Sequence, residues 1–179
     1  VQTCALPISG SYALFGYSVA MSRNPLETSE TIVVGAPGRS NAQGGVYILR
    51  NTATSIQFHQ VFVPASPADG DQFGYSVALA PRLALVNSSG NPVTPRVAFF
   101  AGAPGRSSER GAVFVAERPV SGSSFGTWST LASLVPTGGT VLQPGDRYGA
   151  AVAVATRATT PTTVPTALLV VGAPGMRSE

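Results

Sequence analysis

The sequence contains no lysine and few charged residues of any kind. All 11 basic residues are arginines, and charged residues make up 11% of the chain, against roughly 25% in an average soluble domain. The absence of lysine excludes a P-loop lysine, a Schiff-base lysine and any catalytic ammonium group. The formal net charge is +3 and the pI is about 9.5. Because the arginines are scattered and form no run, we predict a solvated surface and no nucleic-acid partner.

Cysteine and long apolar runs are also scarce. Cys4 is the only cysteine, so no internal disulfide can form and the redox compartment stays open. No stretch approaches the roughly 18 apolar residues of a spanning helix, and we predict no membrane span. Residues 1–8 resemble the translation of a sequencing-adapter oligonucleotide and not a signal peptide. We interpret them as an assembly scar, and we expect the natural N-terminus to be missing.

Glycine and proline, in contrast, are abundant, with 20 and 15 copies, and they punctuate an internal repeat. Three sequence blocks recur in the same order, and the second block recurs at intervals of 67 and 70 residues. The first block is Phe15-Gly16, Phe73-Gly74 and, more loosely, Tyr148-Gly149. The second is Gly35-Ala36-Pro37, Gly102-Ala103-Pro104 and Gly172-Ala173-Pro174. The third aligns Gly45-Val46-Tyr47 with Gly111-Ala112-Val113.

Each block belongs to a short apolar run bounded by Gly, Pro, Ser or Asn, which is typical of a β-strand. No segment combines helix caps with a 3.6-residue period. We therefore predict an all-β fold, a β-propeller fragment of four-stranded antiparallel blades. The predicted strands are 15–22, 31–36, 45–50 and 56–63 in unit one, 73–80, 96–103, 112–118 and 127–135 in unit two, and 148–155 and 167–172 in unit three.

These blocks resemble the FG-GAP repeat of the integrin α-subunit propellers and their relatives, from about residue 12 to the end. The resemblance implies blades at 9–63 and 64–135, with a partial blade at 136–179. Propellers of this family usually have seven blades, so the remaining blades are expected partners of this piece, which should associate when isolated. The resemblance also implies an extracellular or cell-surface glycoprotein for adhesion, binding a protein or an acidic glycan.

The repeated residues have structural explanations that do not depend on the family. The glycines Gly35, Gly102 and Gly172 are expected to end strands, and the prolines that follow prevent further ladder hydrogen bonds. We predict that the repeated aromatic residues Phe15, Phe73 and Tyr148 pack between neighbouring blades. Asp71 and Asp146 lie two residues before their aromatic residue, where a short carboxylate can cap a turn.

Many FG-GAP propellers bind calcium in the loop between the first two strands of a blade, through several carboxylates. In this sequence the corresponding positions carry one carboxylate, Glu27, so we predict neither a metal nor any other cofactor. The positions are Arg23, Pro25, Glu27 and Thr31, then Gly90, Pro92, Thr94 and Ala98, then Thr160, Thr162, Val164 and Leu168.

The sequence also argues against an enzyme. Gly16-Tyr17-Ser18 and its copy faintly resemble a hydrolase nucleophile elbow, but the only imidazole is His59, in a predicted outer strand where an exposed polar position is expected. The run ending at Gly38 resembles a dinucleotide-binding turn, yet no helix follows it. We predict no catalytic residues. Two alternatives stay open: an accessory propeller of a larger secreted enzyme, and a purely structural surface repeat.

Four arginines are the candidate ligand-binding residues. Arg39 and Arg106 directly follow the Gly-Ala-Pro-Gly blocks, Arg177 is displaced by one residue, and Arg110 lies in the same loop as Arg106. Equivalent loops of a propeller share one face, so these guanidinium groups could bind carboxylates of a protein or glycan. The alternative is that they only keep the protein soluble. The candidate surfaces are 39–44, 64–72, 106–110 and 136–147, and Asn87 is a candidate glycosylation site.

Overall fold

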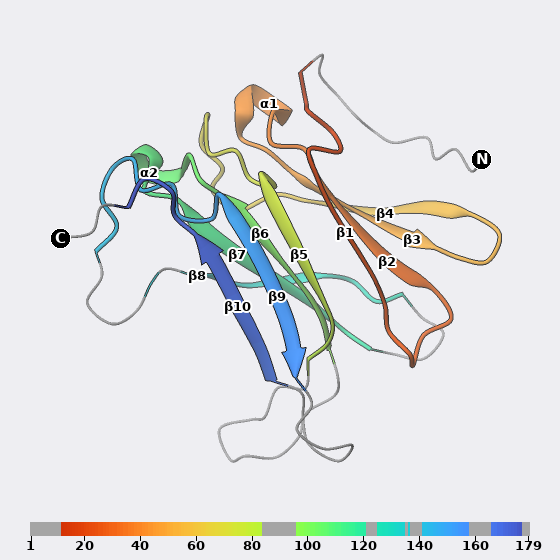
Figure 1. Cartoon of the computed structure of the whole chain (residues 1–179). Coiled ribbons are helices and arrows are strands. Elements are labelled where there is room, and N and C mark those ends of the chain that lie inside the picture. Colours follow the sequence, from red (N-terminus) through yellow and green to blue (C-terminus); the bar gives the residue numbers. More distant parts are fainter. Residues whose placement is uncertain are drawn as a thin grey trace.

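The computed structural model describes residues 12–83, 96–120, 125–134, 136, 141–157 and 166–176. The described residues form three antiparallel sheets in chain order (Figure 1). The first sheet contains β1 (Ser18–Arg23), β2 (Glu30–Gly35), β3 (Val46–Asn51) and β4 (Ile56–Phe62). The second contains β5 (Ser76–Leu83), β6 (Arg96–Ala103), β7 (Ala112–Pro119) and β8 (Ser129–Leu134), and the third contains β9 (Ala151–Arg157) and β10 (Thr166–Gly172). The all-β prediction with four-stranded antiparallel sheets is confirmed.

The predicted strands are all present, but the first strand of each unit begins three residues later than expected. The reason is the Phe-Gly block, where Gly16, Gly74 and Gly149 have φ values of 88°, 85° and 91°. A positive φ is compatible with a turn and not with a strand, so the block leads into the strand without belonging to it.

The alignment of the third block was wrong by one residue. Gly44 and Gly111 both have positive φ, 87° and 85°, and form equivalent bridges to Phe73 and Tyr148. Gly44 is therefore the counterpart of Gly111, and Val46 is the counterpart of Val113, because they pair with Gly35 and Gly102. Local sequence could not resolve this point because two glycines, Gly44 and Gly45, are adjacent.

Two four-residue turns connect the second and third strands of the complete sheets. They are α1 (Arg39–Ala42) and α2 (Arg106–Glu109). Neither is an ordinary helix, because three successive residues in each have positive φ, between 51° and 62°. A left-handed backbone costs roughly 1–2 kcal/mol per non-glycine residue. Such a turn persists only where surrounding contacts hold it.

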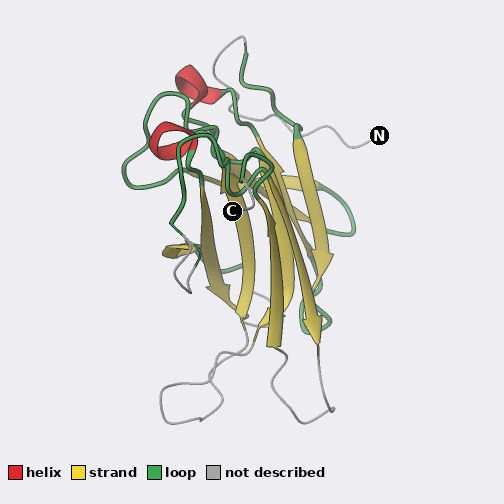
Figure 2. Cartoon of the chain, turned by 60° about the vertical axis from the view of Figure 1, so that its left-hand side comes forward, coloured by secondary structure: helices red, strands yellow, loops and turns green. Residues whose placement is uncertain are grey.

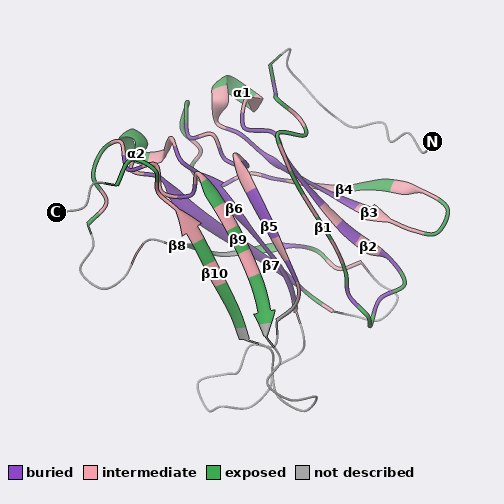
Figure 3. Ribbon diagram, in the orientation of Figure 1, coloured by how far each residue is buried: buried purple, intermediate pink, exposed green. Residues whose placement is uncertain are grey.

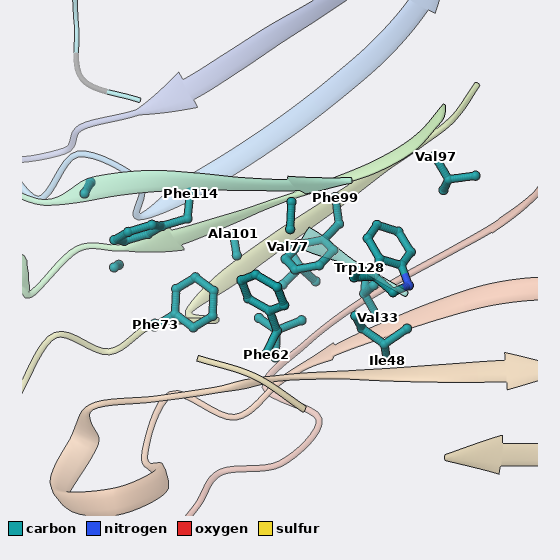
Figure 4. Close-up of a cluster of buried hydrophobic side chains, with 14 residues drawn as sticks. Val33, Ile48, Phe62, Phe73, Val77, Val97, Phe99, Ala101, Phe114 and Trp128 are labelled. Carbon is teal, nitrogen blue, oxygen red and sulfur yellow. The ribbon is translucent and has the colours of Figure 1, made fainter. Parts of the chain in front are cut away.

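The sheets pack face to face, with their first strands side by side and β5 between β1 and β9. A cluster that includes Val33, Ile48 and Phe62 of the first sheet and Phe99 of the second fills the first junction (Figure 4). The rings of Phe62 and Phe99 meet edge to face, with centroids 5.4 Å apart. A second cluster joins β5, β6 and β7 to β9 and β10. The core therefore lies between the sheets.

Two of the three repeated aromatic residues lie in these clusters between neighbouring sheets. Phe73 is fully buried in the first cluster, and Tyr148 packs against the second. The equivalent Phe15 contacts Tyr47 edge to face, with ring centroids 5.2 Å apart, on the outer side of the first sheet.

The outermost strands, β1 and β10, expose apolar side chains. On β1, Val19 and Met21 are 59% and 62% exposed, whereas Val77, the counterpart of Val19 on β5, is 9% exposed. At the other end, Leu168 and Val170 of β10 are 66% and 58% exposed. Figure 3 shows the contrast between the buried second sheet and the exposed strands of the third sheet. Within the described residues, no helix is long and apolar enough to cross a membrane.

Candidate ligand-binding face

The two left-handed turns lie at the same edge of the molecule as the segments that lead into β5 and β9 (Figure 2). We call residues 12–17, 64–75 and 141–150 the lead-in segments. Carbonyl groups of α1 and the residue after it accept hydrogen bonds from the second lead-in segment. The bonds join Asn41 to Gly70 (3.1 Å), Ala42 to Gln72 (2.7 Å) and Gln43 to Phe73 (3.1 Å). The left-handed turn thus directs successive carbonyls at the next sheet.

The same arrangement recurs one sheet further on. The carbonyls of Glu109 and Arg110 accept hydrogen bonds from the backbone N–H groups of Arg147 (2.8 Å) and Tyr148 (3.0 Å). The loops predicted to bind a ligand therefore also join the sheets. Because buried backbone groups must be paired, these bonds offset the strain of the left-handed turns.

The second and first blocks of the repeat meet across the same junctions. A Cβ atom placed on Gly35 or Gly102 would collide with the carbonyl oxygen of Gly74 or Gly149 of the next unit. Beside these contacts, the hydroxyl of Ser18 donates to the Gly74 carbonyl at 2.8 Å, and that of Ser76 donates to the Gly149 carbonyl at 2.7 Å. The serines of the Gly-Tyr-Ser blocks thus link neighbouring sheets.

Arg106 forms an ion pair inside its own repeat unit. Its Nη1 donates to Oδ2 of Asp71 at 2.7 Å and to the carbonyl of Ser66 at 3.1 Å, and its guanidinium lies over the Phe114 ring. The same Asp71 oxygen accepts a hydrogen bond from the N–H of Ala68, and Asp146 accepts one from the N–H of Gln143. The prediction that both aspartates cap turns is confirmed, and Asp71 also neutralises Arg106.

Arg39 has the same backbone position but lacks this partner. Ala13 occupies in the first unit the position that Asp71 occupies in the second. The carbonyl of Ala13 accepts a hydrogen bond from the N–H of Gly38, as the carbonyl of Asp71 does from that of Gly105. Within the described part of the chain, no carboxylate lies within ion-pair distance of Arg39. Its Nε is buried and has no hydrogen-bond partner there. Arg106 is therefore ion-paired within its own unit, whereas Arg39 has no carboxylate partner among the described residues.

Of the other two candidate arginines, the structure describes Arg110 and not Arg177. Arg110 donates through Nε to the carbonyl of Leu142 at 3.2 Å and through Nη1 to that of Ser107 at 3.1 Å. Carbonyl partners satisfy its donors without neutralising its charge. Arg177 lies outside the described residues, as do the glycosylation candidate Asn87 and residues 1–8.

Sequence reasoning missed a cluster at the inner edge of this face. The side chains of Tyr17 and Tyr75, which begin neighbouring units after the Phe-Gly blocks, meet with ring centroids 4.8 Å apart and planes inclined by 48°. A hydrogen bond with Tyr75 raises the pKa of Tyr17, as does burial, while the nearby positive charge of Arg147 acts to lower that pKa. The recurrence of tyrosine directly after Phe-Gly was the signal that could have identified this pair.

At the opposite end of the strands, Glu27 forms a buried ion pair with Arg118. The two carboxylate oxygens accept from Nη1 and Nη2 at 2.5 and 2.7 Å, and the side chains of Arg118 and Glu27 are 0% and 3% exposed. Arg118 also stacks on Phe125 and Trp128, with its guanidinium carbon 4.2 and 5.5 Å from the ring centroids. Glu27, the one carboxylate at the positions that correspond to calcium ligands in FG-GAP propellers, would thus be occupied by an arginine of the second sheet. No group of three metal-ligating side chains occurs among the described residues.

Two further titratable groups lie at this end. Burial raises the pKa of Glu117, although its ion pair with Arg96 acts against this. Burial also lowers the pKa of His59, and its ring stands edge-on to Phe125 with centroids 4.7 Å apart. His59 is half-buried at a sheet junction, and the expectation of a simply exposed polar position was wrong, because Phe125 packs against it.

No protein-family model matches the chain, and no curated protein matches it significantly. The function is therefore inferred from the contacts and charges of these residues.

Proposed function

We propose that the chain is a non-catalytic binding module of an extracellular or cell-surface protein, built as part of a β-propeller of the FG-GAP type. The proposal is supported by the way the sheets are joined. Both junctions use the same contacts at equivalent residues, namely a glycine against a glycine carbonyl and a left-handed turn against the next lead-in segment. A contact that relates each sheet to the next by the same rotation builds a radial array.

The exposed apolar side chains of β1 and β10 fit this assignment. Val19 and Met21 occupy on the first sheet the places that Val77 and Leu79 occupy on the second, where the preceding sheet covers them. Apolar faces of this kind are costly in water. In our proposal, further blades of the same repeat cover them.

Arg39 is the residue that carries the binding function in this proposal. At the equivalent place in the second unit, the aspartate Asp71 binds Arg106 with a charge-assisted hydrogen bond of 2.7 Å. In the first unit Ala13 supplies no carboxylate, so an external carboxylate can take that place. A bound acidic group would gain about 1.5–3 kcal/mol from such a bond, which corresponds to roughly tenfold to a hundredfold in affinity.

Two carboxylate polymers, poly-L-aspartate and polygalacturonate, test this assignment by surface binding at low ionic strength. We expect Arg39→Gln to weaken binding of at least one polymer by about tenfold or more. Ala13→Asp should weaken binding similarly, because it places an internal carboxylate where Asp71 lies in the second unit. The matched control Arg106→Gln should lower stability and leave binding unchanged. The proposal is wrong if the protein binds neither polymer, or if both first-unit variants bind like the wild type.

A further inference from the structure

The inner edge of the binding face brings residues of three sheets together. Tyr17 leads into β1 and Tyr75 into β5, and their rings are in contact at 4.8 Å. The third equivalent position, before β9, is Ala150, so a methyl group replaces the phenol ring there. Arg147, three residues earlier than Ala150, lies close enough for its charge to act on Tyr17. Hydrogen bonds from Ser18 and Ser76 hold the three lead-in segments in this order.

Of the three residues, Tyr17 is the one that is exposed to a ligand. The Tyr17 side chain belongs to a residue that is 51% exposed, although a tyrosine ring is usually largely covered. Tyr75 is half-buried. The Nε atom of Arg147 is buried without a hydrogen-bond partner within the described residues. The cluster thus combines two aromatic rings and their phenol hydroxyls with the positive charge of Arg147.

The chemistry of the cluster indicates which class of ligand fits it. Sugar rings present C–H groups that stack on the electron-rich faces of aromatic rings, and their hydroxyls exchange hydrogen bonds with phenols. A guanidinium binds a carboxylate through paired N–H donors. Because Arg147 is positively charged, the same rings are unsuited to a cationic ligand, which aromatic faces otherwise attract.

The repeat adds a geometric argument. Tyr17 and Tyr75 occupy the same place in successive units, so they offer two equivalent contacts in a row. A linear polymer of similar units meets such a row with successive residues, whereas a small single ligand uses only one of them. This favours an oligosaccharide with acidic sugars.

We propose that Tyr17, Tyr75 and Arg147 form a binding site for a uronate-containing oligosaccharide, with sugar rings against the two tyrosines and a carboxylate on Arg147. The inference rests on the proposed function as a binding module, but it does not require Arg39. It assigns the acidic glycan, in preference to a protein, as the ligand of this part of the face.

The test uses trigalacturonate and its carboxyl-reduced, neutral counterpart, titrated into the whole chain and followed by calorimetry and by shifts of the tyrosine ring resonances. We expect the acidic trimer to bind at least about tenfold more tightly than the neutral one. Tyr17→Ala and Tyr75→Ala should each weaken binding by about tenfold, and Tyr17→Phe, which keeps the ring, should weaken it by less. Arg147→Gln should abolish the preference for the acidic trimer.

Several outcomes would overturn the assignment. They are no binding of either trimer, unchanged binding by both alanine variants, or an intact acid preference in Arg147→Gln. Tighter binding of an oligo-aspartate that shifts the same tyrosine resonances would show that the ligand is a polypeptide. Urea unfolding of each variant establishes that it is folded, and Tyr17→Phe provides a folded substitute if an alanine variant is not. Failure of this inference is distinguishable from failure of the proposed function, because the tyrosine resonances report on this cluster, whereas the polymer test of Arg39→Gln reports on the turn α1.

Discussion

Removing the charge of Glu27 should destabilise the protein strongly, because Glu27 is the carboxylate that neutralises Arg118. The two side chains come from different sheets and are almost fully buried, with exposed fractions of 3% and 0%. Two hydrogen bonds of 2.5 and 2.7 Å join them, and Thr31 accepts a third bond from Nη2 of Arg118 at 3.2 Å. In Glu27→Gln the guanidinium would stay buried without a countercharge.

The expected loss follows from this burial. An exposed ion pair contributes at most about 1 kcal/mol, whereas removing one partner of a buried pair costs about 3–5 kcal/mol. Cation–π contacts with Phe125 and Trp128 compensate part of the remaining charge. We therefore expect Glu27→Gln to lower the free energy of unfolding by about 3 kcal/mol, the lower end of that range.

Equilibrium unfolding in urea measures this change, with the fluorescence of Trp128 as the signal. Trp128 is the only tryptophan, is 3% exposed and has its ring beside Arg118. Its fluorescence therefore reports the junction that the ion pair closes. The matched control is Glu30→Gln, which removes a carboxylate of β2 that bonds Asn51 and is only half-buried.

The double variant Glu27→Gln/Arg118→Met separates the ion pair from packing. Replacing both charges should recover most of the stability, because no uncompensated charge stays buried. The reasoning is refuted if Glu27→Gln costs less than about 1 kcal/mol, the value of an exposed pair. It is also refuted if the double variant is no more stable than the single one.

Three further predictions concern the junctions, the open faces and pH. Gly102→Ala should lower the free energy of unfolding in urea by about 1–3 kcal/mol, because the new Cβ would overlap the Gly149 carbonyl. The counterpart Gly172→Ala should cost less, because the nearest neighbour of its Cβ would be the Ala151 Cβ at 3.2 Å. Equal losses in the two variants would contradict the packing argument. Sedimentation velocity should show concentration-dependent association that Met21→Glu reduces, because Met21 is an exposed apolar residue of β1. A monomer at all concentrations would contradict this prediction. Burial lowers the pKa of His59 below 6.5, so protonation favours the unfolded state. The free energy of unfolding should therefore fall as the pH decreases below 6.5, and His59→Asn should flatten this dependence. Identical pH profiles of the wild type and the variant would contradict the prediction.

The strands and the repeat could be predicted from the sequence because both depend on local features. Short apolar runs between Gly, Pro, Ser and Asn specify strands, and the recurrence of Phe-Gly and Gly-Ala-Pro specifies their order. The capping roles of Asp71 and Asp146 were also predictable, since each bonds a backbone N–H only three residues away. The position of the positive φ in the third block could not be predicted. Gly44 and not Gly45 adopts it, because Gly44 forms the bridge to Phe73 of the next unit.

The tertiary structure alone decided which of the two turn arginines has a carboxylate partner among the described residues. By sequence, Arg39 and Arg106 are equivalent, but Arg106 meets a carboxylate 35 residues away and Arg39 does not. The same holds for the pair of Glu27 and Arg118, which are 91 residues apart. The stacking of the sheets brings these groups together, and the sequence pattern of one strand contains no information about its neighbour in the next sheet. The sequence therefore determined the sheets and their order, while the packing between sheets determined which charges are neutralised and which tyrosines meet.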